Sequence, residues 1–210
     1  MGTCRSELGL PAQEGIEIVG LTKAYADVVA LDGLDLSIAK GELFGLLGPN
    51  GSGKTTTINC LCGLVKPTKG SVRVAGFDAL SETGKVRAII GVSPQETAVY
   101  SHLTGRENIE FFGSLYSCPK DLLAKNAEAL IQRLGLVADA DRRVARYSGG
   151  TKRRVSIAMA LVQDPEVVFL DEPTVTMDPQ SRRAMWEVIK ELKARGKTVV
   201  LTTHYIEEAE

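Results

Sequence analysis

The stretch GPNGSGKT, Gly48 to Thr55, contains the residue types that bind nucleotide phosphates, and it fits the pattern GxxxxGK(S/T) at every position. Glycines let backbone N–H groups close around phosphate oxygens, and a helix that begins at the end of the loop adds its positive pole. We expect the Lys54 ammonium group to reach the β- and γ-phosphates and the Thr55 hydroxyl to coordinate Mg²⁺. The residues predicted to hold the nucleotide are Gly48, Pro49, Asn50, Gly51, Ser52, Gly53, Lys54, Thr55 and Thr56.

Two carboxylates end the apolar run VVFLDE, which is typical of a buried strand. In α/β sheets, ligands bind at the carboxyl ends of the strands. Asp171 is predicted to hold Mg²⁺ through its water shell, and Glu172 is predicted to be the general base for an attacking water. The sequence lacks a guanine-reading NKxD motif, which counts against a GTPase. An acidic pair at a plain strand terminus is the alternative, and the phosphate loop favours the catalytic interpretation.

Strands and helices must alternate to bring these residues to one edge of a sheet. Apolar patterns predict strands in IEIVGL, LDLSI, LFGLL, SVRVAG, AIIGV, EVVFLDEP and TVVLTTH. One helix is expected to begin near Gly53 and to end before Pro67. Another is expected in DPQSRRAMWEVIKELKARG, with Pro179 in its first turn and Gly196 as its stop. This alternation predicts an α/β protein with a mostly parallel core sheet.

The middle of the chain has helical periodicity instead. Thr104 precedes Glu107 by three residues, which is the capping-box pattern of a helix start. Apolar residues then recur at helical spacing, among them Leu123, Leu130 and Leu134. The predicted organisation is a loose tail at 1–14, an α/β nucleotide-binding core at 15–94 and 148–210, and an inserted helical subdomain at 95–147.

The composition fits a globular chain without a strong electric field. Hydrophobic residues make up 44% of the 210 residues, which is ample for a core. The 25 Lys and Arg residues balance 26 Asp and Glu residues, so net charge does not favour a nucleic-acid partner. The longest apolar runs, such as Ile157 to Val162, are far shorter than the roughly 20 residues that span a bilayer. We therefore expect that the chain does not cross a membrane by itself.

A second glycine-rich stretch, YSGGTKRR, runs from Tyr147 to Arg154 and opens an apolar helix. It resembles the signature sequence of the ATP-binding subunit of ABC transporters, and the resemblance extends from about Ile16 to the last residue. It implies a P-loop NTPase fold: a RecA-like, mostly parallel sheet with helices on both faces, a small antiparallel β part and an inserted helical subdomain. It also implies ATP and Mg²⁺ as the cofactors.

In that family two subunits pack head to tail, and the signature of one subunit closes over the phosphates bound to the other. Ser148 would then supply a hydroxyl, and Gly149 and Gly150 would supply backbone N–H groups at the positive end of a helix. The resemblance therefore implies a dimer with a second ATP-binding subunit, and we expect a homodimer.

Four further residues match the family's motifs in order. Gln95, in SPQE, matches the glutamine that contacts Mg²⁺ or the water, and His204, in LTTHYIEEAE, matches the switch histidine at the γ-phosphate. Tyr25 matches the aromatic residue that stacks on adenine, with core packing as the alternative. Asp178, in TVTMDP, matches the aspartate of the loop at the dimer interface. The implied catalytic residues are Glu172, His204, Gln95 and Lys54, and the implied metal ligands are Thr55, Gln95 and Asp171.

The sequence departs from the family pattern at three points. Thr176-Met177 stand where Gly-Leu is usual, and losing a glycine restricts the backbone of the interface loop. Thr151 stands where Gln or Met is commoner. The chain stops at Glu210, where the family continues, so we expect C-terminal strands of the core to be missing.

The resemblance implies an ATPase that drives a separate integral membrane permease from the cytoplasmic face of the cell membrane, as a peripheral subunit, through the surface near 95–103. The stretches YSGG, PQETAVYSHLTGRENIEFF and TTHYIEEAE look most like exporters of drugs and lipids, including the daunorubicin-resistance group. No nucleic-acid partner is expected. Two alternatives remain: a non-transport ABC ATPase that acts on ribosomes or DNA, and a nucleotide-gated scaffold that dimerises but scarcely hydrolyses ATP.

Overall fold

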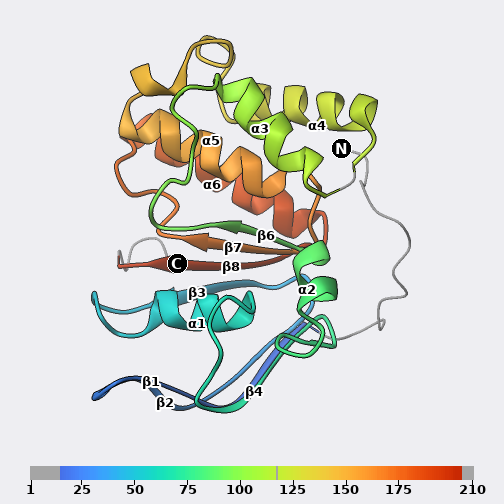
Figure 1. The fold of residues 1–210 in the computed structure, drawn as a ribbon. Coiled ribbons are helices and arrows are strands. Elements are labelled where there is room, and N and C mark those ends of the chain that lie inside the picture. The colour runs from blue at the N-terminus through green and yellow to red at the C-terminus, as the bar shows by residue number, and fades with distance from the viewer. Residues whose placement is uncertain (1–14, 117, 205–210) are drawn as a thin grey trace.

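The computed structural model describes residues 15–116 and 118–204, which form two sheets with helices between and above them (Figure 1). The predicted tail at 1–14 and the last residues, 205–210, lie outside the described residues. Among the helices that the structure describes, none combines the length and the apolar character needed to cross a bilayer.

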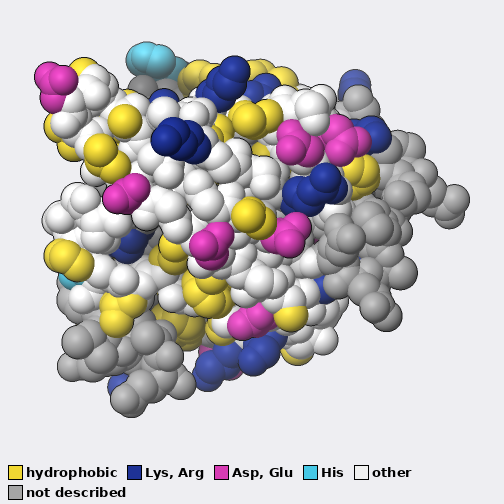
Figure 2. Space-filling view, turned by 90° about the horizontal axis from the view of Figure 1, so that it is seen from below, with side chains coloured by type: hydrophobic (Ala, Val, Ile, Leu, Met, Phe, Trp, Pro, Cys, Tyr) yellow, Lys and Arg dark blue, Asp and Glu magenta, His cyan; other side chains and the backbone are white. Residues whose placement is uncertain are grey.

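An antiparallel sheet forms one end of the molecule, with strand order β2-β1-β4-β5. Its strands are β1 (Ile16–Tyr25), β2 (Val28–Ile38), β4 (Lys69–Val74) and β5 (Phe77–Asp78). The alternation predicted for the first strand is present, since Ile16 and Ile18 are buried and Glu17 is exposed. Both β1 and β2 extend beyond the predicted ranges, because a tight turn joins them and pairs Tyr25 with Val28. The outer face of this sheet carries charged side chains of both signs among scattered hydrophobic ones (Figure 2).

A parallel sheet forms the second layer, with strand order β3-β8-β7-β6. Its strands are β3 (Leu43–Leu47), β6 (Ile90–Ser93), β7 (Val167–Asp171) and β8 (Thr198–Thr203). All residues of β7 and β8 are buried, which fits strands that are covered on both faces. The register pairs Leu47 with Thr203, Asp171 with Thr202 and Ser93 with Leu170. The carboxyl ends of all four strands therefore meet at one edge.

Helices cover both faces of the parallel sheet, as predicted (Figure 1). Helices α1 (Lys54–Leu61) and α2 (Thr83–Ile89) lie on the side of the antiparallel sheet, while α5 (Gly149–Leu161) and α6 (Pro179–Ala194) lie on the other side. The sequence did not predict α2, and it extended the β6 strand back to residue 88. Burial of Val86 and Ile89 at helical spacing explains why this short segment folds as a helix.

The segment 95–147 contains α3 (Gly105–Ser114), α4 (Lys120–Arg133) and a 3₁₀ turn at Val144–Arg146. The predicted capping box is confirmed at the start of α3, where Glu107 N donates to Thr104 Oγ1 over 3.1 Å and Thr104 N donates back to the Glu107 carboxylate over 2.8 Å. Helix α3 packs against both α4 and α5, and Asn126 Nδ2 donates to Val162 O at the end of α5 over 3.0 Å. The helices of this segment are thereby fixed to the helix that begins with the YSGG stretch.

Candidate nucleotide site

The phosphate loop joins β3 to α1 and adopts a backbone that requires glycine. Gly51 and Gly53 have positive φ values of 81° and 90°. A Cβ on Gly53 would lie only 2.7 Å from Ala30 O on β2, so an alanine there would collide with main-chain atoms. The loop is thus held against the antiparallel sheet, and the residues at the start of α1, whose first N–H groups have no acceptor within the helix, line the cavity beside it.

A cavity of about 360 Å³ opens beside this loop. Its lining consists of Ala30, Asn50, Gly51, Gly53, Lys54, Thr55, Thr56, Gln95 and Glu172. The Lys54 ammonium group bends back over the loop and donates to Gly48 O over 2.6 Å and to Pro49 O over 2.9 Å. The structure therefore brings the predicted phosphate loop, Gln95 and Glu172 together around one cavity.

Asp171 lies at the end of β7 between two hydroxyl groups. Thr55 Oγ1 donates to its Oδ2 atom over 2.8 Å, and Thr202 Oγ1 donates to its Oδ1 atom. A hydroxyl and a carboxylate beside a phosphate site are oxygen ligands of the kind that Mg²⁺ uses, directly or through water. Thr55 and Asp171 could therefore hold the metal, and Thr202 orients the carboxylate. Sequence patterns did not single out Thr202, whose only signal is its place near the end of a strand.

Glu172 receives contacts from two loops of the chain. Gln95 Nε2 donates to its Oε2 atom over 3.0 Å, and His204 Nδ1 lies 3.3 Å from its Oε1 atom. Its backbone has a φ of 51°, and its amide donates to Thr202 Oγ1 over 2.9 Å. Because a residue other than glycine rarely adopts this conformation, the turn is a local strain held by its surroundings. The arrangement directs the carboxylate into the cavity, where it could accept a proton from a water.

The YSGG stretch is elsewhere in the same chain. Ser148 caps α5, where its Oγ atom accepts from Thr151 N over 3.2 Å. Gly149 and Gly150 face the Thr176 loop, since a Cβ on Gly150 would lie 3.2 Å from Thr176 O. None of the three lines the cavity beside the phosphate loop. These groups are thus separate from the cavity that their own chain forms beside the phosphate loop.

Asp178 and Tyr25 are also absent from the cavity lining, as are the predicted residues Gly48, Pro49, Ser52, Asp171 and His204. Asp178 caps α6 and accepts from Ser181 N, Ser181 Oγ and Gln180 N over 2.9, 2.6 and 3.0 Å. These bonds lower the pKa of the Asp178 carboxyl, and the bonds from Ser181 have the largest effect. Tyr25 is exposed at the end of β1, with the Lys23 ammonium 4.7 Å from its ring centroid, so it is not packed in the core. Ala30 of β2 does line the cavity, and sequence patterns did not indicate it.

The glycine loop joins the parallel strand β3 to a helix, and carboxylates stand at the end of β7, which is separated from β3 by β8. This arrangement defines a P-loop nucleotide-binding protein. Residues 31–175 match the family described as ABC transporter. A dimeric post-hydrolysis structure of the ATP-binding cassette MJ0796 bound to ADP and Pi has a TM-score of 0.85 and 30% identity, covering 91% of this chain and 89% of that chain. The chain therefore belongs to the ABC transporter family and has the fold of its nucleotide-binding cassette, as the sequence predicted.

Curated relatives include resistance and export proteins. The daunorubicin resistance ATP-binding protein DrrA3 of Streptomyces coeruleorubidus is 42% identical over 95% of this chain and 63% of its own length. The linearmycin resistance ATP-binding protein LnrL of Bacillus subtilis (strain 168) is 42% identical over 93% of this chain and 63% of its own length. The Nod factor export ATP-binding protein I of Paraburkholderia xenovorans (strain LB400) is 42% identical over 94% of this chain and 65% of its own length. The chain thus spans less than two thirds of the length of these relatives.

Proposed function

We propose that this chain is the ATP-hydrolysing subunit of an ABC transporter. The observation that carries the proposal is the cluster at Glu172: one carboxylate beside the phosphate loop contacts both Gln95 and His204. A plain strand terminus would not need two polar side chains from distant loops around one buried carboxylate. The clustering favours a site that handles a water molecule.

Hydrolysis follows from positioning and charge in this arrangement. Lys54 and the N–H groups of the phosphate loop bind the β- and γ-phosphates of ATP, and the dipole of α1 adds to this attraction. Thr55 and Asp171, with Gln95, would hold Mg²⁺, which supplies charge neutralisation at the phosphates. Glu172 accepts a proton from the attacking water, and His204 holds that water toward the γ-phosphate. Tyr25 stacks on the adenine.

A second cassette completes the site. Ser148, Gly149 and Gly150 do not line the cavity of their own chain, and they stand at the positive end of α5. In a head-to-tail dimer they close over the γ-phosphate held by the partner, with Asp178 at the interface. The dimeric structures solved for the MJ0796 cassette support this assembly. We take the dimer to contain two copies of this chain.

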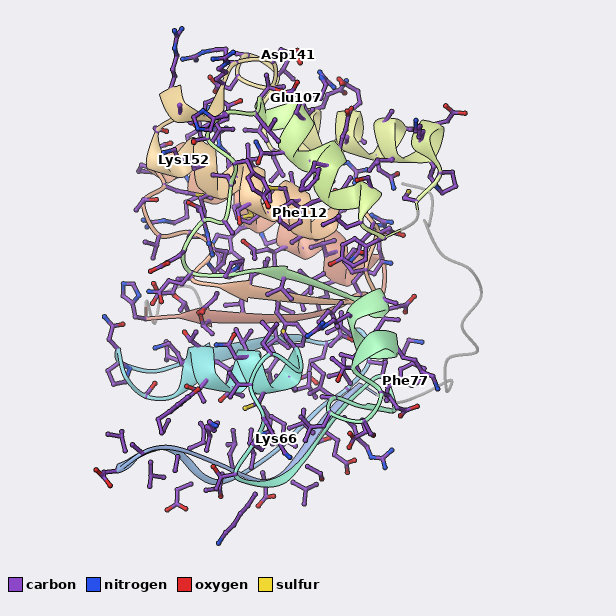
Figure 3. All side chains as sticks on the ribbon, in the orientation of Figure 1. Lys66, Phe77, Glu107, Phe112, Asp141 and Lys152 are labelled. Carbon is purple, nitrogen blue, oxygen red and sulfur yellow. The ribbon has the colours of Figure 1, made fainter. Side chains whose placement is uncertain are left out.

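An integral membrane permease is the other partner, which places the chain on the cytoplasmic face of the cell membrane as a peripheral subunit. Its docking surface is an apolar cavity of about 220 Å³ between α2, α3, α5 and β6. Pro94 and Ala98 of the Gln95 loop line it together with Phe112 of α3, which lies above the parallel sheet (Figure 3). Tyr100 packs beside it and is 53% exposed. A segment of the permease in this cavity would contact the loop that carries Gln95.

The names of the relatives favour export of drugs, lipids or other hydrophobic compounds. DrrA3 and LnrL are named for resistance to daunorubicin and linearmycin, and the Paraburkholderia protein is named for export of the Nod factor. These names describe those proteins. For this chain we propose the same class of cargo.

Phosphate release tests the catalytic proposal. We expect ATP-dependent release by the parent chain that is absent in Lys54→Ala, and a Glu172→Gln chain that binds ATP and accumulates as a dimer in light scattering. A parent chain that dimerises with ATP but releases no phosphate above the Lys54→Ala control would instead be a nucleotide-gated scaffold.

Cross-linking tests the docking surface. A photoreactive group at Ala98 should capture an integral membrane protein in native membranes, and Tyr100→Asp should abolish the capture. Val137→Asp is the matched control, because Val137 is exposed but does not line the cavity. Capture of ribosomal or DNA-binding proteins alone would favour the non-transport alternative.

A further inference from the structure

Arg153 is a buried arginine that joins two loops of the nucleotide site. It lies on α5, and only 3% of it is exposed. Its Nη1 atom donates to Pro94 O and, over 3.3 Å, to Gln95 O, while its Nη2 atom donates to Asp171 O. Sequence patterns did not single it out, because a basic residue at a helix start is usually a solvated one.

The three acceptors belong to the two segments that carry the catalytic side chains. Pro94 and Gln95 follow β6, and Asp171 ends β7 directly before Glu172. The side chains of Gln95 and Glu172 then meet over 3.0 Å. Because the guanidinium group is a planar fork of fixed width, donors on two of its nitrogens fix how far apart the two segments lie.

The charge of Arg153 also belongs to the site. Burial lowers the pKa of the guanidinium group to about 10, while the carboxylates of Asp171 and Glu172 act in the opposite direction. The group therefore remains a cation at neutral pH. Its hydrogen bonds go to carbonyl oxygens instead of a carboxylate, and its Nε atom has no partner among the described residues. A buried cation held in this way is weak evidence for a role in stability.

We propose that Arg153 is a positioning residue that holds Gln95 against Glu172 and ties this pair to the helix that begins with Ser148–Gly150. The first part concerns contacts within one chain. The second part rests on the proposed function, in which Ser148–Gly150 close on the partner's ATP. The start of α5 would then contact the partner's nucleotide. Arg153, four residues after the first residue of the same helix, would position the general base Glu172 of its own chain.

Arg154 is a matched control from the same helix. Its Nη1 atom also donates to two carbonyl oxygens, Leu134 O over 3.1 Å and Gly135 O over 2.9 Å, and its Nε atom also has no partner in the described part of the chain. These acceptors lie at the end of α4, away from the cavity. The Nη2 atom of Arg154 also donates to Thr151 Oγ1 over 3.3 Å. Arg154→Gln therefore removes the same charge and the same kind of bond without altering a contact of Gln95, Asp171 or Glu172.

The first test uses the nucleotide-free chain and needs no activity. In ¹⁵N NMR spectra, the side-chain amide signal of Gln95, assigned by its loss in Gln95→Glu, reports the contact with Glu172. Glu172→Ala removes the acceptor and gives the signal of an unbonded Gln95. We expect Arg153→Gln to move the signal to that position and Arg154→Gln to leave it at the parent position. An unchanged signal in a folded Arg153→Gln chain would overturn the proposal.

The second test measures steady-state ATPase activity and ATP binding. Misplacing the general base should lower kcat about tenfold or more in Arg153→Gln, with the Kd for ATP within about threefold of the parent value. Arg154→Gln should retain the parent kcat. Equal losses of kcat in the two variants, or an effect that appears only in the Kd, would overturn the positioning role of Arg153.

Arg153→Lys is the conservative variant. Lysine keeps the charge but lacks the planar fork, so the Gln95 signal and kcat should fall between those of the parent and of Arg153→Gln. If Arg153→Gln does not give the far-UV circular dichroism of the folded parent, Arg153→Lys decides by the same two readouts, and parent values in both would overturn the proposal. A parent chain without turnover above Lys54→Ala would count against the proposed function, while the NMR result would still decide on Arg153.

Discussion

Thr55 Oγ1 donates a hydrogen bond of 2.8 Å to Oδ2 of Asp171, which joins residues 116 positions apart in the chain. The bond exists because β3 and β7 both pair with β8 in parallel, so the phosphate loop and the acidic strand end meet at one edge. Hydroxyl and carboxylate thus form one oxygen-rich unit before any ligand binds. This unit determines how the site should respond to magnesium.

Removing the Thr55 hydroxyl should weaken magnesium-dependent binding specifically. For Thr55→Val we expect the Kd for ATP with Mg²⁺ to rise about tenfold, because the metal loses one ligand and Asp171 loses a bonded neighbour. The Kd for ATP with a chelator should stay within about twofold. Calorimetric titration under both conditions measures this. Thr83→Val is the control, since Thr83 Oγ1 donates to the backbone oxygens of Ala79 and Leu80, just before α2. Equal weakening with and without Mg²⁺ would contradict the metal role.

A large side chain in place of Ser148 should stop ATP turnover without preventing ATP binding. Ser148 does not line the cavity of its own chain, so Ser148→Arg should bind ATP as a monomer with the parent Kd and release no phosphate above Lys54→Ala. Ser148→Asn is the control for capping, because asparagine also caps helices well and adds little volume. ATP titrations at concentrations where the chain is monomeric give the decisive measurement. Lost ATP binding in Ser148→Arg would mean that the signature acts within one chain.

Thr176 should be a point of removable strain. Its φ is 67°, a left-handed conformation that β-branched residues rarely adopt. Glycine relieves that strain but adds freedom to the unfolded chain, so Thr176→Gly should raise the free energy of unfolding by about 1 kcal/mol. Urea unfolding followed by circular dichroism measures the change. Thr174→Gly is the control: Thr174 is buried and has no positive φ, so glycine there should destabilise the chain.

Acid should weaken the cap that Asp178 places on α6. Its pKa in the folded chain lies below the ordinary value of 3.8, so the ionised carboxylate stabilises the fold above about pH 4, and this contribution is lost as the pH falls below 3.8. Asparagine caps helices without ionising. The stability difference between the parent and Asp178→Asn should therefore shrink as the pH falls from 6 toward 3 in urea titrations. A difference that stays constant over this range would show that the charge of Asp178 contributes nothing.

Local sequence patterns were sufficient wherever one short segment decides the geometry. The phosphate loop, the strand ending in Asp171 and the capping box at Thr104 each depend on residues within one turn or strand. The sequence patterns did not predict the ends of β1 and β2 that form the hairpin turn, or the helix α2, because the patterns in these segments are short or weak. In α2, tertiary burial of Val86 and Ile89 decides between strand and helix.

Contacts between distant segments could not be predicted from patterns. Thr202 orients Asp171 only because β7 and β8 pair in one register. Arg153 bonds to main-chain carbonyls, which carry no residue signature. Asp178 was predicted as an interface residue from the family motif, and its bonds to Ser181 show that it also caps a helix in its own chain.

The pairing of β7 with both β6 and β8 makes the site a reporter of correct folding. Successive side chains of a strand point to opposite faces, so sliding β7 by a single residue would turn Asp171 away from Thr55 and Thr202. A collapsed chain with misaligned strands would keep its hydrophobic interior yet have no place for magnesium. Retention on an ATP affinity resin should therefore separate natively paired molecules from those that are only compact.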